Sequence, residues 1–401
     1  MKKHLLLISC IVLVLQSQAQ TPAIYSTLPN GGTARDLIFK GPDTSFCINS
    51  YWLYRSTDDL KTWQNSVELQ FGGAYTFTSM DGFGEKIMAG QNTGGRYILS
   101  NDAGATWSDV KFIGKNQQVN DIEFLNSTTV FALASSGSST DSIILFKSTD
   151  GAETWERVYK FPKRGANARM TFLNASIGAV YFNSNLYITK DAGLNWYSPS
   201  GIDTTENVLS VYLYDAQNAF VGQDAGGLYK STDGMQTFNF TQSVFPRLDY
   251  ENQLLFSDLS TGYVTEGYTR DFAFRKTTDG GVNWTTLATG VNFKNFHIVD
   301  DNTVYLYGAN NNFYKVSTVL SGINTNEISS NIKIYPNPST GLVTIKSTEN
   351  IKDKTLRVYS SLGKLIQEQH IGINDFQINL VDAGIYILMI DHQVVGRVNI
   401  Q

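Results

Sequence analysis

Three arginines of this chain, Arg35, Arg169 and Arg247, carry the side chain best suited to hold a carboxylate. A guanidinium presents parallel N–H donors that match the two oxygens of a carboxylate or a phosphate. Each arginine stands near the start of a segment with strand character, so the three side chains could converge at one end of a repeated structure. The alternative is that they are ordinary solvated charges of surface loops.

Six acidic residues occupy comparable positions and bear on a possible hydrolase activity. Glycoside cleavage needs two carboxyl groups about 5 to 10 Å apart. Spacing along the chain does not fix that separation, so an unrelated set of surface acids is the alternative interpretation. The six residues are Asp36, Asp224, Asp249, Glu251, Glu266 and Asp271.

Other chemistry finds little support in the sequence. The histidines that follow the first twenty residues, His297, His370 and His392, form no cluster with metal-ligand spacing. No glycine-rich phosphate loop leads into a helix, and no nucleophile stands with a base in a known arrangement. We therefore expect no metal and no cofactor. A formal net charge of −5 argues against a nucleic-acid or anionic-membrane partner.

The elements that would position these residues are indicated by a phrase that occurs six times. Each copy starts with Ser or Thr, has Asp two residues later, and ends with Trp or Phe five residues after the aspartate. The aspartates are separated by 44, 48, 41, 42 and 46 residues, the period of one four-stranded blade of a β-propeller. The aspartates and closing aromatic residues are Asp58, Trp63, Asp102, Trp107, Asp150, Trp155, Asp191, Trp196, Asp233, Phe238, Asp279 and Trp284.

The residue types of the phrase suit the turn from the third to the fourth strand of a blade. The carboxylate can accept hydrogen bonds from backbone N–H groups of its own turn, glycine tolerates a positive φ, and the aromatic ring packs beneath the hairpin. The strands lie between the copies, for example at 119–124, 129–133 and 143–147. A calcium loop would need alternating oxygen donors, which the phrase lacks.

A seventh blade is expected after the sixth phrase. Residues 296–299, 303–307 and 313–316 are typical of three strands, and residues 23–27 supply the fourth by pairing the two ends of the repeat. The sequence therefore predicts an all-β fold in which residues 20–318 form a seven-bladed β-propeller.

The repeated phrase resembles the Asp-box of the BNR-repeat families. These include sialidases, sortilin-type receptor domains, xyloglucan-cleaving hydrolases and a photosystem assembly factor, so the resemblance implies the propeller but leaves the function open. The arginine cluster and the Tyr/Glu nucleophile pair of a sialidase cannot be assigned here, and the Arg-Ile-Pro phrase of that family is absent. The two-propeller cleft of the xyloglucan-cleaving relatives is absent as well.

A second domain is predicted after a polar linker at 319–331. Seven short apolar segments between 332 and 401 indicate a small Ig-like β-sandwich. This segment resembles the type A C-terminal sorting domain of the type IX secretion system, which implies export across an outer membrane and recognition by the secretion machinery there. Its last strand has fewer basic residues than is usual in that family. The residues that carry the resemblance are Tyr335, Pro336, Asn337, Pro338, Gly341, Gly384 and Tyr386.

The first nineteen residues are typical of a secretory signal peptide. Lys2 and Lys3 precede an apolar run from Leu5 to Leu15, and small residues follow at a cleavage site near Ala19. Only Cys47 would then remain, so no internal disulfide is expected. No later segment approaches the roughly 18 apolar residues of a membrane-spanning helix.

From the residues and these resemblances we expect a non-catalytic binding propeller that recognises a protein or a glycan. We expect the protein to pass through the periplasm and to be secreted or attached to the cell surface. A glycoside hydrolase of sialidase-like or glucan-cleaving type is the alternative. Recognition is expected in the loops opposite the repeated turns, since loops on a rigid scaffold usually carry binding residues. The candidate binding residues are Arg35, Arg164, Arg169, Arg247, Tyr250, Glu266, Tyr268 and Arg270.

Overall fold

The computed structural model consists of β-strands joined by turns and loops, and the part of the chain that it describes contains no helix. The described residues are 21–40, 43–68, 76–114, 117–136, 142–162, 167–242, 247–248, 253–267, 272–290, 293–300, 303–308, 310–317, 332–336, 339, 341–360, 365–381, 384–390 and 393–400. The predicted signal peptide and linker, together with Arg164, Tyr250, Tyr268, Arg270, Asn337 and Pro338, lie outside these residues.

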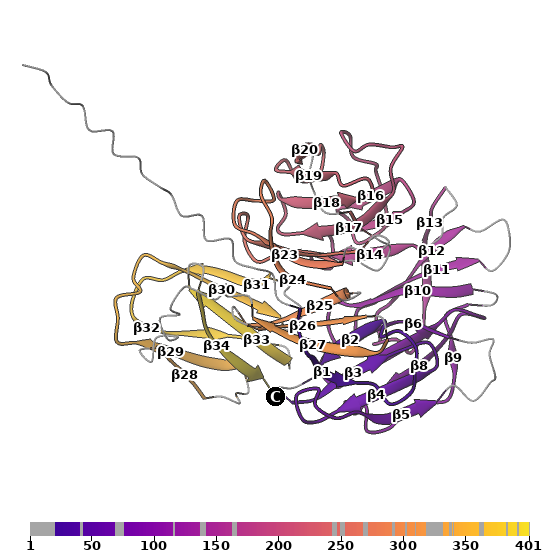
Figure 1. The fold of residues 1–401 in the computed structure, drawn as a ribbon, viewed down its shortest axis with the longest axis horizontal. Coiled ribbons are helices and arrows are strands. Elements are labelled where there is room, and N and C mark those ends of the chain that lie inside the picture. Colours follow the sequence, from indigo (N-terminus) through magenta and orange to yellow (C-terminus); the bar gives the residue numbers. More distant parts are fainter. Residues whose placement is uncertain are drawn as a thin grey trace, which may run out of the picture.

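Between residues 24 and 317, the described strands form seven separate antiparallel sheets of three or four strands. Figure 1 shows them succeeding one another in chain order, from indigo through magenta to orange. In six of these sheets all strands are consecutive neighbours in an up-and-down meander, and the seventh has three consecutive strands plus one from the start of the chain. This is the arrangement that short strands with tight turns favour.

The strands occupy equivalent places in the seven sheets. The first strands are β2 (Asp36–Phe39), β6 (Phe77–Asp81), β10 (Gln117–Phe124), β14 (Arg169–Phe172), β17 (Val208–Leu213), β21 (Leu254–Phe256) and β25 (Phe293–Asp300). The second strands are β3 (Ser45–Ile48), β7 (Ile87–Gln91), β11 (Val130–Ser136), β15 (Gly178–Phe182), β18 (Ala219–Gln223), β22 (Gly262–Glu266) and β26 (Thr303–Gly308). The third strands are β4 (Trp52–Ser56), β8 (Arg96–Ser100), β12 (Ile143–Ser148), β16 (Asn185–Thr189), β19 (Leu228–Ser231), β23 (Ala273–Thr277) and β27 (Asn312–Ser317). The fourth strands are β5 (Gln64–Glu68), β9 (Lys111–Phe112), β13 (Glu156–Lys160), β20 (Asn239–Gln242), β24 (Thr285–Thr289) and, for the last sheet, β1 (Ile24–Thr27).

The last sheet takes its fourth strand from the start of the chain, as the sequence predicts. Strand β1 pairs antiparallel with β27, with Thr27 opposite Asn312. The first and last sheets also share one buried cluster, in which Tyr54 and Tyr305 are fully buried. Across the same seam, the side chain of Asn295 donates a 3.3 Å hydrogen bond to the carbonyl of Arg35. Both ends of the repeat region are therefore held together by backbone pairing and by core packing.

Each repeated phrase forms the turn that follows a third strand, and its aspartate caps that turn. In the copy after β12, Asp150 accepts hydrogen bonds from the Ser148 hydroxyl at 2.7 Å and from the Thr154 backbone N–H at 2.9 Å. The Thr154 hydroxyl donates to the second carboxylate oxygen at 2.5 Å. These bonds satisfy the polar groups of a tight turn within the turn itself.

The aromatic residue of the phrase packs across to the preceding sheet. Trp107 lies edge-on to Phe46, with ring centroids 6.3 Å apart, and the indole of Trp155 donates a 3.0 Å hydrogen bond to the Tyr97 hydroxyl. Trp284 packs against a buried cluster that contains Phe220 and Leu228 of the preceding sheet. The phrase thus joins neighbouring sheets as well as closing a hairpin, since each large ring fills the gap between two sheets.

Residues 332–400, here named the tail, fold separately into two sheets around one core. The core contains apolar residues from both sheets, including Val343, Ile345, Val358 and Leu388. One sheet has the order β28 (Ile332–Tyr335), β29 (Leu342–Ser347), β32 (Asp375–Asn379). The other has the order β31 (Leu365–His370), β30 (Thr355–Ser360), β33 (Gly384–Ile390), β34 (Gln393–Ile400).

Candidate functional site

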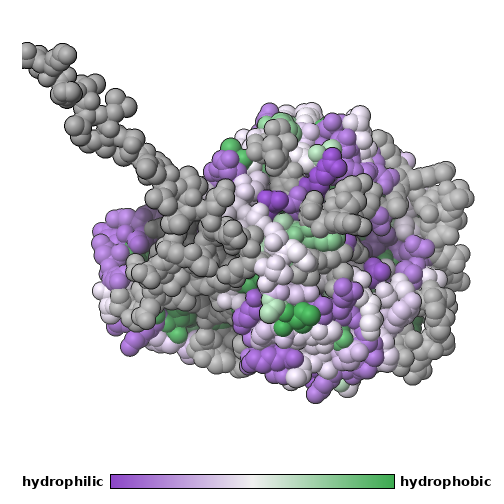
Figure 2. All heavy atoms as spheres, in the orientation of Figure 1, coloured by the Kyte–Doolittle hydropathy of each residue, from purple (hydrophilic) through white to green (hydrophobic). Residues whose placement is uncertain are grey.

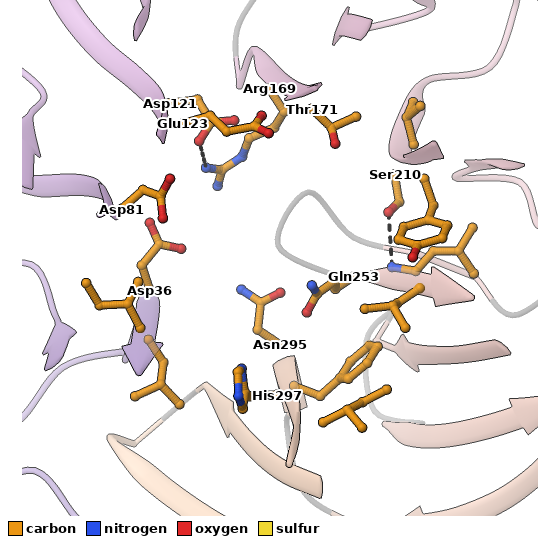
Figure 3. A pocket seen from close by; sticks show the side chains of 18 of the residues that line it. Asp36, Asp81, Asp121, Glu123, Arg169, Thr171, Ser210, Gln253, Asn295 and His297 are labelled. Carbon is orange, nitrogen blue, oxygen red and sulfur yellow. Dashed lines mark hydrogen bonds and ion pairs between the residues drawn. The ribbon is translucent and has the colours of Figure 1, made fainter. Parts of the chain in front are cut away.

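A cavity of about 390 Å³ lies where the first strands of the seven sheets face one another. Two rings of side chains line it, and each ring has one residue from every sheet, at equivalent positions. The first ring consists of Asp36, Ser79, Asp121, Arg169, Ser210, Gln253 and Asn295. The second ring, two residues further along each first strand, consists of Ile38, Asp81, Glu123, Thr171, Tyr212, Leu255 and His297. Residues two apart on a strand share a face, which explains why both rings point into the cavity (Figure 3).

Bulges in the first strands set the direction of the first ring. In four sheets the pairing of the first and second strands shifts immediately before the ring residue, namely before Ser79, Asp121, Ser210 and Asn295. A bulge adds one residue to one strand and re-aims the side chains that follow. A polar side chain is thereby turned inward at the same level of each of these sheets.

Hydrogen bonds from residues of the two rings connect several of the neighbouring sheets. Asp36 accepts one from the backbone N–H of Met80 at 2.8 Å, and Asp121 accepts one from the N–H of Met170 at 2.9 Å. The Ser79 hydroxyl likewise accepts a hydrogen bond from the backbone N–H of Ile122 at 3.2 Å, and the Ser210 hydroxyl accepts one from the N–H of Leu254 at 3.1 Å. In the second ring, Asp81 accepts from Phe124 at 2.6 Å and Glu123 from Phe172 at 2.9 Å. The acids of the cavity therefore bind backbone groups of the neighbouring sheet.

Two acids of the first ring face a single arginine. Arg169 lies 3.8 Å from the Asp121 carboxylate (Figure 3), and its charge also lowers the pKa of Asp36. Burial outweighs this effect, because removing a carboxylate from water disfavours its charged form. Burial raises the pKa of Asp36 to about 6 and also raises the pKa of Asp121.

Asp81 of the second ring has a basic neighbour in Lys40. Burial raises the pKa of Asp81 to about 7 and lowers the pKa of Lys40 to about 8. The attraction between the two groups opposes both shifts. The Lys40 ammonium also donates a 3.0 Å hydrogen bond to the carbonyl of Lys86. Lys40, which directly follows β2, therefore links the first sheet to the second at the end of the first strands.

Only one of the described candidate binding residues lines the cavity. Arg169 belongs to the first ring, whereas Arg35, Arg247 and Glu266 are not among the cavity-lining side chains. Glu266 accepts a 2.6 Å hydrogen bond from the Arg275 guanidinium. The predicted convergence of three arginines is thus replaced by one arginine that faces two carboxylates.

Of the predicted acids that the structure describes, which are Asp36, Asp224 and Glu266, Asp36 is the one that lines the cavity. Asp224 accepts a 2.7 Å hydrogen bond from the side chain of Asn207, while Asp249, Glu251 and Asp271 lie outside the described residues.

Sequence reasoning missed Asp81, and it recognised the segment that contains Asp121 and Glu123 only as a strand. A usable signal was present, because the first-ring residues recur at 43, 42, 48, 41, 43 and 42 residues, nearly the period of the repeated phrase. Within the described residues, no group of three or more His, Cys, Asp or Glu side chains is arranged to hold a metal ion. No described helix is long and apolar enough to cross a membrane.

Solved structures similar to this chain are β-propellers. YCF48 bound to a D1 peptide aligns with a TM-score of 0.58 and 15% identity, covering 76% of this chain and 99% of that one. YCF48 from Cyanidioschyzon merolae aligns with a TM-score of 0.56 and 14% identity, covering 73% and 99%. The WD40 β-propeller domain of Doa1 aligns with a TM-score of 0.54 and 12% identity, covering 74% and 97%. At these identities the likeness concerns the fold alone.

The tail matches a known family. Residues 333–396 match the family described as the secretion system C-terminal sorting domain, as the sequence predicts. No curated protein sequence matches the chain. A domain of this family implies export by type IX secretion, to the cell surface or into the medium. The chain therefore combines a fold of the β-propeller type with a C-terminal sorting domain of a secretion system.

Proposed function

We propose that residues 20–318 form a seven-bladed Asp-box propeller that, after type IX export, binds a protein or a glycan through its central cavity. The ligand enters at the end where the first strands begin, opposite the repeated turns. The Ig-like sandwich of residues 332–401 acts as the export signal. Its partner is the outer-membrane secretion machinery.

The observation that carries this proposal is the first ring. It places a polar side chain from each first strand around one cavity, with a single cation among them. Ligand sites are typically concave and contain a few convergent polar groups on a rigid framework. Arg169 is half-buried and lies 3.8 Å from Asp121, and a guanidinium is a group that recognises carboxylates well.

Binding is favoured over turnover because the acids of the cavity have structural partners. Asp36, Asp81, Asp121 and Glu123 each accept a hydrogen bond from a backbone N–H of the next sheet. A carboxylate that supports the framework in this way is restricted in position and in charge. The neighbour solved with a D1 peptide is consistent with peptide recognition by a related architecture.

The test is a binding measurement on the whole exported chain with peptide and glycan panels. We expect saturable binding that weakens at least tenfold in Arg169→Gln and is unchanged in Arg247→Gln, an arginine outside the cavity lining. Binding that responds to Arg247→Gln but not to Arg169→Gln would place the ligand on the rim loops instead. An absence of binding across both panels would contradict the proposal.

A glycoside hydrolase is the second candidate, and one observation favours it. Asp36 and Asp121 share a cavity with Arg169, and burial raises the pKa of both carboxyl groups, as in acid catalysts of glycosidases. This candidate predicts hydrolysis of fluorogenic glycosides that is abolished by Asp36→Asn or Asp121→Asn and retained in Asp224→Asn. An absence of turnover with a broad set of glycosides would rule out the hydrolase candidate.

A further inference from the structure

We propose that the tail docks onto the propeller and closes the end of the central cavity at which the first strands finish. Three tail side chains, Tyr359 of β30 and Ile387 and Met389 of β33, line the cavity together with residues of the propeller. The sorting domain then closes one end of the central cavity in addition to acting as an export signal.

The contact uses one face of a single sheet of the tail. Alternate residues of a strand point to opposite faces, and Val358 and Leu388 enter the tail's own core. Their neighbours Tyr359 and Ile387 point the other way and are paired across β30 and β33. This outward surface, the docking face, consists of Tyr359, Ile387 and Met389, and it would be apolar and exposed on an isolated sandwich.

The sequence of β33 independently indicates burial on both faces. The segment Ile385–Ile390 is apolar at every position, whereas a strand with one solvated face alternates between apolar and polar residues. Strand β29 of the other sheet shows that alternation from Val343 onward, with Val343 and Ile345 fully buried and the intervening Thr344 and following Lys346 polar and more exposed. Met389, in contrast, is only 7% exposed although it faces away from the tail's core.

The propeller supplies specific partners for the docking face. The Tyr359 hydroxyl donates a 3.0 Å hydrogen bond to the carbonyl of Ser257, which directly follows β21. Tyr359 also hydrogen-bonds with the side chain of Tyr214, which directly follows β17. Tyr359 and Tyr214 are 4% and 6% exposed. A buried hydroxyl that is satisfied across an interface favours one docked arrangement over others.

The location of these partners identifies the end of the cavity that is covered. Ser257 and Tyr214 follow the ends of first strands, on the side of the repeated turns, because both kinds of turn lie at the same edge of an up-and-down sheet. Figure 1 shows the yellow strands of the tail beside the orange strands of the last sheets. Because the tail covers this end, ligand access in the intact chain is restricted to the opposite end. In Figure 2 the exposed apolar side chains form small separate patches among hydrophilic ones.

The test uses the full chain with a protease site inserted between residues 318 and 331. After cleavage, we expect the tail fragment to co-elute with the propeller in size-exclusion chromatography. The double substitution Ile387→Glu, Met389→Glu should release it, whereas Leu342→Glu, the same kind of change on the other sheet of the tail, should not. Separation of the unsubstituted fragments, or co-elution of the double variant, would overturn the proposal.

Two further measurements separate loss of docking from loss of folding. Tyr359→Phe removes only the hydroxyl, with its hydrogen bonds to Ser257 and Tyr214, and should weaken re-association at least fivefold. Hydrogen exchange at the backbone amides of Tyr214 and Ser257 should accelerate when the tail is separated from the propeller. The amides of Leu125 and Leu173 form the same turn hydrogen bond on other sheets and serve as matched controls. An unchanged affinity in Tyr359→Phe, or equal acceleration at all four amides, would contradict docking at this end.

Discussion

The carboxylate of Asp36 accepts a 2.8 Å hydrogen bond from the backbone N–H of Met80, which lies on the next sheet. Antiparallel pairing within a sheet leaves some N–H groups of its first strand without a partner on the cavity side. A polar side chain from the neighbouring sheet satisfies them, and the same solution recurs between Asp121 and Met170. The inner surface of the propeller is therefore held together by side-chain to backbone bonds between adjacent sheets.

Removal of the Asp36 acceptor should destabilise the fold without any loss of apolar contact. Asp36→Ala leaves the Met80 N–H unsatisfied, and we expect a decrease of about 1 to 3 kcal/mol in the free energy of unfolding. Asp36→Asn keeps an acceptor oxygen and should cost less. Urea denaturation measures both, with the exposed Asp109→Ala as a matched control. Equal stability of Asp36→Ala and Asp109→Ala would show that the bond has no structural role.

The stability of the protein should fall as the pH rises from about 4 to about 6. Burial raises the pKa of Asp36 to about 6, so in this range the folded state holds a proton that the unfolded state has released. Stability decreases with pH wherever the folded state binds more protons, and the loss in the free energy of unfolding from this one group is at most about 3 kcal/mol. Asp36→Asn should flatten this part of the curve. An identical pH profile for Asp36→Asn and the unsubstituted chain would contradict the assignment.

The aspartates of the repeated turns should act in the opposite direction and at lower pH. Hydrogen bonds from their own turns, led by the Thr106 and Thr237 hydroxyls, lower the pKa of Asp102 and of Asp233 to about 2. Their contribution is therefore present above pH 4 and is lost as the pH falls toward 2. We expect Asp150→Ala to lower the free energy of unfolding by about 1 to 2 kcal/mol at pH 7, from lost turn bonds. Glu156→Ala, an exposed change on the following strand, is the control, and equal effects would contradict the capping role.

Gly104 and Gly84 allow a comparison between crowding and backbone strain. Both have positive φ, at 76° and 56°, but a Cβ on Gly104 would collide with the ring of Phe46 while one on Gly84 would meet nothing within 4 Å. Gly84→Ala should cost about 1 kcal/mol from strain alone. Gly104→Ala should cost about 1 to 3 kcal/mol more, because Phe46 is fully buried. Thermal and urea unfolding measure the difference, and equal losses would mean that Phe46 moves aside without cost.

The repeated phrase allowed much of the fold to be predicted because its residues act locally. Ser148, Asp150 and Thr154 satisfy one another within seven residues, so their pattern survives as a readable motif. The pairing of residues 23–27 with the last sheet was also predictable, since three strands without a fourth leave an exposed edge. Strand β1 pairs with β27 as this reasoning requires.

The cavity was harder to predict because its residues share a position but no residue type. Asp36, Arg169 and Gln253 occupy equivalent places on three sheets, and each looks like an isolated polar residue in a strand. Bulges such as the one before Asp121 also shift the inward face by one residue, which disturbs the alternation used to assign faces. Aligning the first strands by the period of the phrase would have revealed the ring.

Deletion of residues 332–401 should retain the protein in the periplasm, because this segment contains the sorting domain at 333–396. Cell fractionation and immunoblotting of the deleted and full-length chains measure the outcome, with a periplasmic marker as the reference. Fusing residues 319–401 to an unrelated periplasmic protein should carry that protein out of the cell. Leu342→Glu, placed on the exposed side of β29, should leave export unchanged. Appearance of the deleted chain outside intact cells would show that the propeller itself carries an export signal.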